Sequence, residues 1–426
     1  MNLNQLLKDV ECKSCGRVHT CPIEHIYVES DAISHLRELC KDYTRILLVA
    51  DENTYLAGGE KTEKSLEGKE ITRVIFSGKT ILVPNENAIE RVKSDLGNNQ
   101  IIVGIGSGVI QDLCKYVSHF HKIPYVIVAT APSMDGYASN GAAMILKGMK
   151  DTVPCGLPKA IIADTQVLKN APMEMIKAGY GDIVGKLSAL NDWKLSRVVN
   201  DEYFCQYIYD ETYKMIAATI KTAKGLLERD EESIKALSLA LMQVGIMMSF
   251  ATTSRPASGS EHHLSHFFEI TGIVHGEEYL PHGVDVAFST VITQKLREEI
   301  LRLDSYDRQY IPQRQEYEAI INKLYGVVGS GCIALQDKMK RYVTDRSKIY
   351  KEKEREIREI LKEVPPSGEI LRLLSLASLD ISQFEKAYSK KKIENAILYA
   401  KDLKDRYTVL WLYYDLLGDK NETYQG

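Results

Sequence analysis

Four short, mostly apolar runs in the first 130 residues constrain the fold of this chain more than any other feature. They cover residues 45–50, 72–76, 100–103 and 125–129. Runs of this length are typical of strands that are buried on both faces, as in a parallel sheet. Amphipathic stretches such as 87–96 lie between them and carry apolar residues at helical spacing. This alternation predicts an α/β nucleotide-binding domain.

The sequence changes character after about residue 175. Strand-like runs largely end there, and helical patterns extend over 173–190, 202–228 and 231–250. A charge-rich stretch over 337–363 predicts a further helix with a solvated face. A chain of 426 residues is long enough for two or three domains. We therefore predict an α/β nucleotide-binding domain over 1–172 and an all-helical domain over 173–426.

The charge balance argues against nucleic acid and membrane partners. The chain has 54 Lys and Arg residues against 58 Asp and Glu residues, a net charge of −4. Such a chain has no overall field for a polyanion, so a small anionic substrate would need a local cluster of donors. The N-terminus is polar, and no apolar run reaches the ~20 residues that span a bilayer. We expect a cytoplasmic protein.

Eight cysteines in 426 residues are too dispersed for a disulfide framework, and we expect thiols in a reducing cytosol. One group is closely spaced: Cys12, Cys15, His19 and Cys21. Three thiols and one imidazole within ten residues could bind a structural zinc. The alternative is a cysteine-rich strand and turn without a metal. The sequence leaves both interpretations open.

A glycine-rich turn follows the run at 100–103 and opens a helix. It contains Gly106, Ser107, Gly108 and Val109, with Asp112 further on. Glycines let backbone N–H groups approach a phosphate closely, and a helix N-terminus adds favourable partial charge. The turn lacks the third glycine of the usual dinucleotide fingerprint. It predicts a phosphate-binding turn, and the alternative is a tight turn without a ligand.

The run at 125–129 ends in a loop of small hydroxyl residues around one carboxylate. Its members are Thr130, Ser133, Asp135 and Ser139. Ligands of open α/β sheets bind at the carboxyl ends of the strands, which is where this loop is predicted to lie. The alternative is a surface loop in which Asp135 caps a turn.

The helical part contains a carboxylate and several histidines with the spacing of metal ligands. Asp182 and Lys186 are one helical turn apart, as are His262 and His266, and His282 precedes an apolar run. One carboxylate and two imidazoles would form a three-ligand site with open positions for substrate. Singly, a buried histidine is more often a core residue than a ligand, and spacing alone does not bring these segments together.

Two other histidines lie near these candidates in the sequence. His275, followed by Gly276 and Glu277, competes for the third ligand position with His282. We favour His282 because it directly precedes the apolar run 284–288. His263 would point away from the face that His262 shares with His266, so we predict a structural role for it.

Four motifs together resemble a known family: Gly-Ser-Gly-Val-Ile-Gln-Asp, Thr-Ala-Pro-Ser-Met-Asp-Gly-Tyr-Ala-Ser, Ala-Gly-Tyr-Gly-Asp-Ile-Val-Gly-Lys and Ser-Arg-Pro-Ala-Ser-Gly-Ser-Glu-His-His. They look like the glycerol-1-phosphate dehydrogenases, in particular the bacterial type. That family belongs to the superfamily of iron-containing alcohol dehydrogenases, glycerol dehydrogenases and dehydroquinate synthases. The resemblance extends from 51–55 to 405–410, and its most specific motif is 255–266.

The resemblance implies a dehydroquinate synthase-like fold in which the helical domain binds metal and substrate. It implies the reversible reduction of dihydroxyacetone phosphate, a small phosphorylated substrate, to glycerol-1-phosphate. The implied cofactors are NAD or NADP and one divalent metal, which is nickel, zinc or iron. Members of this type are homodimers. Lipid backbone synthesis and sugar-phosphate metabolism would both fit such an enzyme, so the pathway stays open.

The resemblance also implies roles for individual residues. Asp182, His262 and His282 are implied as metal ligands, so that Asp182 is also a catalytic residue, and Asp135 and His266 are implied to contact substrate. The residues implied to bind the cofactor are Asp51, Gly106, Ser107, Gly108, Val109, Asp112, Thr130, Ser133 and Ser139. One departure concerns His282, which lies in a His-Gly-Val-Asp sequence, whereas the His-Gly-Glu common in the superfamily occurs at His275.

Several alternatives remain at the level of sequence. Arg255 and Lys186 are candidates for binding the substrate phosphate, and either could be a structural ion-pair partner instead. A dehydrogenase of free glycerol or another polyol would need no such cation. A dehydroquinate synthase-like lyase uses a glutamate as the first metal ligand, where this chain has Asp182. A non-catalytic binding protein of the same fold is the last alternative. The sequence does not decide between NADH and NADPH.

Overall fold

The computed structural model describes residues 3–146 and 149–422, and the chain divides into two compact units. Unit 1 comprises Met1–Ile183 and Lys214–Ser254, and unit 2 comprises Val184–Tyr213 and Arg255–Gly426. Two helices, α6 (Met173–Asn200) and α7 (Gln206–Ile220), each run through a division between the units. The domain bounds predicted from the sequence, 1–172 and 173–426, stay a prediction.

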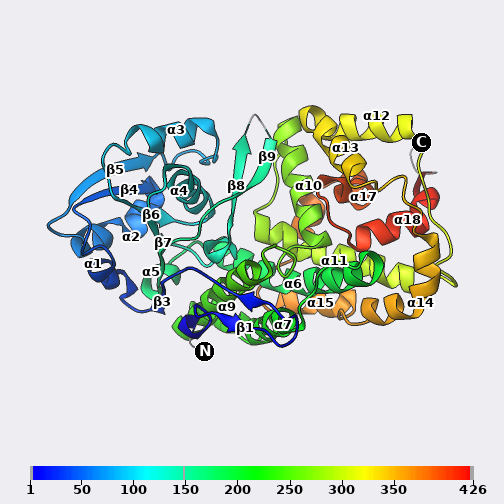
Figure 1. Cartoon of the computed structure of the whole chain (residues 1–426), viewed down its shortest axis with the longest axis horizontal. Helices are drawn as coiled ribbons and strands as arrows, with labels where there is room; N and C mark the ends of the chain where they lie inside the picture. Colours follow the sequence, from blue (N-terminus) through cyan, green and yellow to red (C-terminus); the bar gives the residue numbers. More distant parts are fainter. Residues whose placement is uncertain (1–2, 147–148, 423–426) are drawn as a thin grey trace. The chain divides into compact units, whose positions relative to one another are not determined.

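Unit 1 is built on a six-stranded parallel sheet with the strand order β3-β10-β7-β6-β4-β5 (Figure 1). Its strands are β3 (His25–Glu29), β4 (Arg45–Asp51), β5 (Glu70–Phe76), β6 (Ile101–Gly106), β7 (Tyr125–Ala129) and β10 (Ala160–Asp164). The four predicted apolar runs correspond to β4, β5, β6 and β7. Every residue of the central strands β6 and β7 is buried, which explains why their sequences do not alternate.

Register and packing place the carboxyl ends of the central strands next to one another. Gly106 at the end of β6 pairs with Ala129 at the end of β7, and Val103 pairs with both Leu48 of β4 and Val126 of β7. One apolar cluster joins alternate side chains of these strands to the short helices η2 (Ala32–His35) and α1 (Leu36–Leu39). Two strands that are buried along their whole length therefore support the loops that follow them, whereas the edge strands β3 and β5 carry exposed residues.

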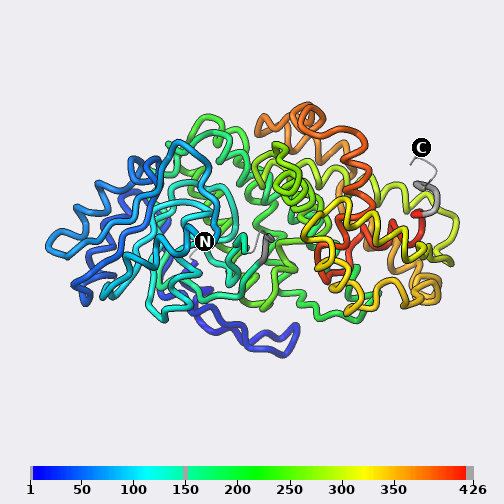
Figure 2. Tube along the Cα trace, turned by 90° about the horizontal axis from the view of Figure 1, so that it is seen from above, coloured from blue at the N-terminus to red at the C-terminus, as the bar shows by residue number. Residues whose placement is uncertain are grey.

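The remaining elements of unit 1 cover the sheet or extend from it (Figure 2, blue to green). They are η1 (Leu3–Gln5), α2 (Glu52–Ser65), α3 (Glu86–Ser94), α4 (Gly108–His121), η3 (Gly136–Ala138), α5 (Thr165–Leu168), α8 (Ala223–Leu227) and α9 (Glu231–Ala251), with the two-stranded pairs β1 (Val10–Glu11) with β2 (Val18–His19) and β8 (Gly141–Leu146) with β9 (Met149–Pro154). Asp51 and Asn85 begin α2 and α3 by accepting backbone hydrogen bonds, as N-cap residues do.

Helix α9 is a core helix of high hydropathy. An 18-residue window of it has a mean hydropathy of 1.6, and it is the one helix of the described residues that is long and apolar enough to cross a membrane. We expected no apolar run long enough to span a bilayer, and judged by length and composition alone this expectation was wrong for α9. However, 78% of that window is buried in the structure. Such burial is what the core of a globular fold requires of an all-round apolar helix.

Unit 2 contains only helices within the part of it that the structure describes. Besides the segments of α6 and α7, they are α10 (Ser260–His275), α11 (His282–Leu301), α12 (Arg314–Tyr325), η4 (Gly326–Val328), α13 (Gly329–Lys338), α14 (Ser347–Leu361), α15 (Ser367–Ser375), α16 (Ile381–Ala387), α17 (Lys390–Tyr399), η5 (Ala400–Leu403) and α18 (Val409–Glu422). The predicted helix over 337–363 is too long at its start, because turns separate α13 from α14 and Lys340 adopts a left-handed backbone conformation with φ 54°.

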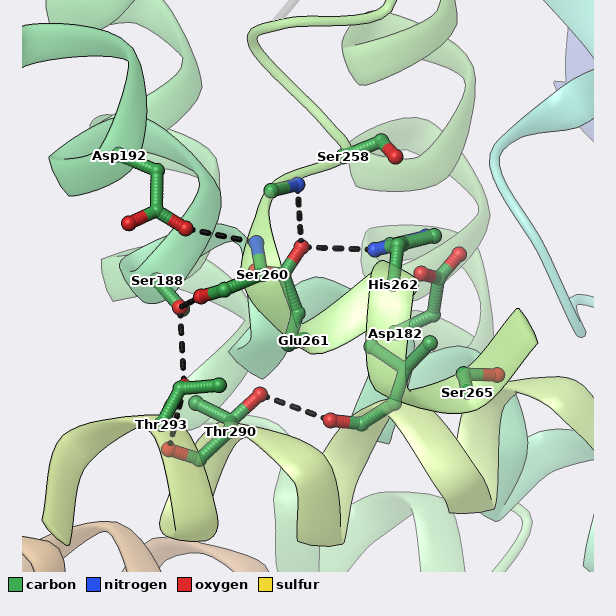
Figure 3. Close-up of polar contacts among 12 residues, drawn as sticks. Asp182, Ser188, Asp192, Ser258, Ser260, Glu261, His262, Ser265, Thr290 and Thr293 are labelled. Carbon is green, nitrogen blue, oxygen red and sulfur yellow. Dashed lines mark hydrogen bonds and ion pairs between the residues drawn. The ribbon is translucent and has the colours of Figure 1, made fainter. Parts of the chain in front are cut away.

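A buried ion pair holds four helices of unit 2 together. Arg297 of α11 donates from Nη2 to Asp192 Oδ1 of α6 at 2.8 Å, and both side chains are fully buried. Asp192 also accepts from the backbone N–H of Ser260 at 2.6 Å and of Val409 at 2.9 Å, the first residues of α10 and α18. Figure 3 shows the bond to Ser260. One carboxylate therefore fixes the starts of two helices, including the one that carries His262.

Candidate active site

The glycine turn of unit 1 forms an open helix N-terminus. Ser107 is the N-cap of α4, yet its side chain makes no capping bond. Its Oγ lies 2.7 Å from Ser133 Oγ of the next loop. A Cβ placed on Gly108 would meet no atom within 4 Å among the described residues. An N-terminus without a side-chain cap, beside open space, suits the phosphate of a dinucleotide.

The loop after β7 lies against this turn. Thr130 donates its backbone N–H to Gly106 O at 3.2 Å, and the Tyr137 hydroxyl donates to the same carbonyl at 3.2 Å. Together with the contact between Ser107 and Ser133, these bonds bring the glycine turn and the hydroxyl-rich loop side by side. Both lie at the carboxyl ends of adjacent strands, where open α/β sheets bind ligands.

Lys115 is a residue of this region that the sequence reasoning missed. Its side chain is fully buried, and Nζ donates to Gly141 O at 2.8 Å, Gly136 O at 3.1 Å and Ser139 Oγ at 3.4 Å. Asp112 lies 3.8 Å away. Burial lowers the pKa of Lys115, and the charge of Asp112 opposes this effect. A lysine three residues after Asp112 on the apolar face of α4 was the available signal.

Asp51 and Val109 have definite local roles. Asp51 Oδ1 accepts from the backbone N–H of Asn53 at 2.8 Å and of Thr54 at 2.9 Å, so the carboxylate caps α2 at the end of β4. The side chain of Val109 packs, partly buried, against an apolar cluster that includes residues of the hairpin β8–β9. Any contact of Val109 with a cofactor would therefore involve its backbone.

Three histidines come together in unit 2. His262 and His266 lie on α10, and His282 is the first residue of α11. The ring centroid of His262 is 5.1 Å from that of His282, and the centroid of His266 is 5.6 Å from that of His282. His275 ends α10 instead, where it is exposed and its Nε2 bonds Leu324 O at 2.9 Å. The structure therefore groups His282, rather than its competitor, with His262.

Each of the two proposed imidazole ligands has its Nδ1 occupied. His262 Nδ1 lies 2.7 Å from Glu261 Oε1, which also accepts from Gly259 N–H at 2.8 Å (Figure 3). His282 Nδ1 lies 3.2 Å from Ser265 Oγ. When Nδ1 carries the proton, Nε2 presents its lone pair, which is the tautomer that a metal-binding histidine needs. The described residues of this cluster therefore fit a divalent metal.

The surroundings of His262 are electropositive. Burial is the main cause that lowers its pKa well below the usual value, so the ring is neutral at pH 7. Positive charges add to this effect, in the order Lys186, His282, Lys404 and Arg406. Lys404 and Arg406 lie on the segment before α18 and donate to Ser258 Oγ at 3.4 Å and Ser258 O at 3.0 Å. This part of unit 2 is suited to an anion.

Glu261 is the second residue that the sequence reasoning missed. Its carboxyl group is fully buried, and burial together with the negative charge of Asp192 raises its pKa to about 7. The adjacent His263 is also fully buried, with no hydrogen-bond partner for either ring nitrogen among the described residues. A carboxylate directly before His262 was the available signal for a group that orients a metal ligand.

Asp182 and Asp135 meet in unit 1. The backbone N–H of Asp135 donates to Asp182 Oδ2 at 3.3 Å, and Asp182 is fully buried. Helix α6 is continuous from Met173 to Asn200, so Asp182 lies one turn before Lys186 on the same helix face. The structure thus brings together the two predicted acidic residues in unit 1 and the three histidines in unit 2. Their union in one metal site is a proposal.

Arg255 is excluded as a phosphate ligand by its own contacts. Its guanidinium forms a bidentate ion pair with Glu202, in which Nε donates to Oε1 at 2.6 Å and Nη2 donates to Oε2. It also donates to Tyr407 O at 2.9 Å and to Ser196 Oγ at 3.2 Å, and it is 2% exposed. Arg255 is therefore a structural ion-pair partner, because its donors are directed to partners within unit 2.

Known proteins are similar to this chain in both sequence and fold. Residues 27–172 match the family described as iron-containing alcohol dehydrogenase. An NAD(P)+ glycerol-1-phosphate dehydrogenase of Halalkalibacterium halodurans is 28% identical over 96% of this chain and 98% of its own length. One from Thermococcus sibiricus is 31% identical over 61% of this chain and 77% of its own length.

The same class appears among solved structures. An iron-containing alcohol dehydrogenase from Thermococcus thioreducens superposes with a TM-score of 0.61 at 14% identity, covering 96% of this chain and 100% of that one. The parallel sheet followed by helices is therefore the fold of the iron-containing alcohol dehydrogenases, which confirms the predicted fold class. Within that class, this chain belongs to the family of glycerol-1-phosphate dehydrogenases.

Proposed function

We propose that this chain is a metal-dependent oxidoreductase that reversibly reduces dihydroxyacetone phosphate to glycerol-1-phosphate with NADH or NADPH. The observation that carries the proposal is the pair His262 and His282, whose Nδ1 atoms are engaged by Glu261 and Ser265. This arrangement leaves two Nε2 atoms for a metal, within an electropositive part of unit 2. The names of the relatives specify the same dehydrogenase activity.

The proposed metal ligands are Asp182, His262 and His282, which would bind one divalent ion. Oxygen and imidazole ligands suit nickel, zinc and iron, and availability in the cell decides among them. The continuity of α6 supports the inclusion of Asp182, because this helix carries the carboxylate one turn before Lys186. When bound, the ion polarises the ketone oxygen and stabilises the negative charge that forms there.

The proposed cofactor site is the open N-terminus of α4 with its neighbouring loops. Backbone N–H groups at Ser107, Gly108 and Val109 would hold the pyrophosphate, and the absent side chain of Gly108 leaves room for it. Gly106, which is assigned to the same site, lets Ile110 pack closely against the turn. The other residues assigned to this site are Asp51, Asp112, Thr130, Ser133 and Ser139. When bound, the reduced nicotinamide supplies a hydride to the ketone carbon.

Proton delivery is assigned to His266. As the ketone becomes an alcohol, its oxygen must gain one proton, and an imidazole beside the metal ligands is suited to supply it directly or through a water. The ring of His266 stacks on that of His282 at 5.6 Å between centroids. Asp135 is proposed to contact the substrate from the loop after β7 and to hold it toward the cofactor.

The substrate phosphate is proposed to bind Lys186, Lys404 and Arg406 in place of Arg255. These three cations are the non-histidine charges that act on His262. Lys404 and Arg406 are half-buried, which strengthens their attraction for an anion relative to exposed side chains. A polyol dehydrogenase would not need such a cluster, so its presence favours a phosphorylated substrate.

The function is tested by following NADH and NADPH oxidation with dihydroxyacetone phosphate and, separately, with dihydroxyacetone. The protein is first stripped of metal and then given nickel, zinc or iron. We expect reduction of the phosphorylated ketone alone, and only when a metal is present. Equal or faster reduction of dihydroxyacetone would establish the polyol dehydrogenase alternative. Failure with both ketones under every metal would favour the lyase or the non-catalytic protein.

The phosphate site predicts a specific effect for Lys404→Ala and Arg406→Ala. Each variant removes a charge-assisted hydrogen bond worth about 1.5–3 kcal/mol, so KM for dihydroxyacetone phosphate should rise roughly 10- to 100-fold. The measurement is steady-state kinetics with the phosphorylated ketone. The matched control is Lys194→Ala, because Lys194 is paired with Glu363 at 2.6 Å on the same unit. A KM that rises equally in the control would contradict the assignment.

The location, oligomeric state, partners and pathway of the enzyme are proposals as well. We propose a cytoplasmic homodimer that binds neither nucleic acid nor membranes. The net charge of −4 and the near balance of 54 basic against 58 acidic residues support the absence of nucleic acid and anionic membrane partners, because a polyanion partner requires a strong positive field. A role in lipid backbone synthesis agrees with the proposed product.

A further inference from the structure

The N-terminal hairpin of unit 1 carries a group of soft metal ligands that the proposed reaction does not use. Strands β1 and β2 pair in antiparallel fashion, with Val10 opposite His19. At the turn between them, Cys12 N–H donates to Arg17 O at 2.9 Å and Gly16 N–H donates to Cys12 O at 2.8 Å. Gly16 has φ 70°, a conformation that glycine adopts without strain. This tight turn places two thiols and an imidazole on one short segment.

The donor atoms of this segment lie close enough to share one ion. The donor atoms of Cys12, Cys15 and His19 all lie within 4.8 Å of one another. Cys15 Sγ is 3.5 Å from His19 Nε2. A tetrahedral zinc with a Zn–S bond of about 2.3 Å and a Zn–N bond of about 2.05 Å separates sulfur from nitrogen by about 3.6 Å. The observed separation therefore matches two ligands of one ion.

The imidazole is held in the orientation that a metal ligand needs. His19 Nδ1 lies 3.0 Å from Phe250 O in the last turn of α9, and the His19 ring stacks on the Phe250 ring with 5.2 Å between centroids. Donation from Nδ1–H to this carbonyl leaves the Nε2 lone pair directed toward Cys15. A backbone carbonyl on the other ring nitrogen is the usual outer partner of a metal-bound histidine. His19 is 1% exposed, so the ring is fixed by packing.

We propose that Cys12, Cys15 and His19 bind a structural zinc ion that closes the N-terminal hairpin and fixes His19 where it contacts the end of α9. Thiolate and imidazole ligands select zinc over the oxygen-preferring cations, and a fourth ligand from outside the hairpin completes a tetrahedral site. Cys21, which the sequence placed in this group, is not among the grouped donors of the described residues. The site is separate in its ligands from the proposed catalytic metal, which uses oxygen and imidazole only.

The test measures thiolate-bound zinc in the full-length enzyme. A mercurial reagent that attacks thiolates should release one zinc per chain, detected with a zinc-binding dye. The same amount should be released from the unmodified enzyme and from the Asp182→Asn variant, which lacks one proposed ligand of the catalytic metal. Replacement by Co2+ should give the near-ultraviolet charge-transfer band of a cobalt–thiolate bond, which the proposed catalytic site cannot produce. Both measurements use folded protein, so they do not depend on how well a hairpin variant folds.

Variants then locate the ligands. Cys12→Ser, Cys15→Ser and His19→Ala should each lose the mercurial-released zinc, as measured by total metal content after dialysis. Cys21→Ser is the matched control, because this cysteine lies on the same segment and should leave the zinc bound. Failure of the mercurial to release zinc, or an unchanged zinc content in all three ligand variants, would overturn the proposal. If these variants lose zinc but still reduce the ketone, the zinc site is independent of the proposed catalytic function.

Discussion

Replacing His282 with alanine should abolish nearly all ketone reduction. The variant removes one of three proposed metal ligands, so the protein should lose its catalytic metal during dialysis. Polarisation of a carbonyl by a bound metal is worth several kcal/mol, and each 1.4 kcal/mol corresponds to a tenfold change in rate. We therefore expect kcat to fall by roughly 10³-fold or more. The measurement combines metal content with NAD(P)H oxidation at saturating ketone.

Two further variants make this result specific. His275→Ala is the matched control, because His275 ends the helix that carries His262 but bonds Leu324 O at the exposed C-terminus of α10. It should retain metal and activity. Ser265→Ala removes the partner of His282 Nδ1, together with a longer bond to His282 O at 3.5 Å, and keeps the ligand itself. It should weaken metal binding by about 10- to 100-fold, an intermediate effect. Equal metal loss in His275→Ala and His282→Ala would contradict the assigned ligand set.

Asp192→Asn should strongly destabilise unit 2. The substitution leaves the Arg297 guanidinium buried without its counter-charge, and breaking a buried pair in this way costs about 3–5 kcal/mol. It also weakens the acceptor for the first N–H groups of α10 and α18. Urea unfolding followed by tryptophan fluorescence measures this effect selectively, because Trp193 and Trp411 are the two tryptophans of the chain and both lie in unit 2.

The control for this prediction is an exposed ion pair of the same chemistry. Asp337 pairs with Arg314 at 2.5 Å, but their side chains are 50% and 46% exposed. Exposed pairs contribute about 0–1 kcal/mol, so Asp337→Asn should barely move the urea midpoint. If Asp192→Asn shifts the midpoint no more than Asp337→Asn, the buried pair does not hold the four helices as described.

The sheet could be predicted because its central strands obey a strong and simple constraint. Strands β6 and β7 are buried on both faces, so their apolar runs stand out in the sequence. The edge strand β3 did not stand out because it alternates buried and exposed residues over only five positions. Strand β10 was missed although all five of its residues are buried, as they are in β7. The helices α6 and α9 were predicted from their apolar patterns. The predicted helix over 202–228 was wrong at its start and in its interior, because α7 begins only at Gln206 and a turn separates it from α8, and the turns before α14 were not predicted either.

The candidate site was predicted only at the level of its ligands. The family resemblance implied His262 and His282 as ligands, and the structure groups the two rings in unit 2. Their partners Glu261 and Ser265 were missed, because a hydrogen bond to Nδ1 depends on side-chain direction rather than on spacing. Lys404 and Arg406 were missed because they lie more than 100 residues away along the chain. Arg255 was overrated, since its ion pair with Glu202 is a long-range contact.

The interleaved chain path of the two units limits how this enzyme can be recombined. A gene fragment for the α/β region alone would omit α9, whose Ser249 Oγ bonds Ala138 O at 3.1 Å beside the loop that carries Asp135. Such a fragment should expose an apolar face and aggregate, because the helix that covers it is encoded some sixty residues downstream. Exchange of cofactor preference between relatives would therefore require transplanting two separate chain segments together, and a single crossover point would not suffice.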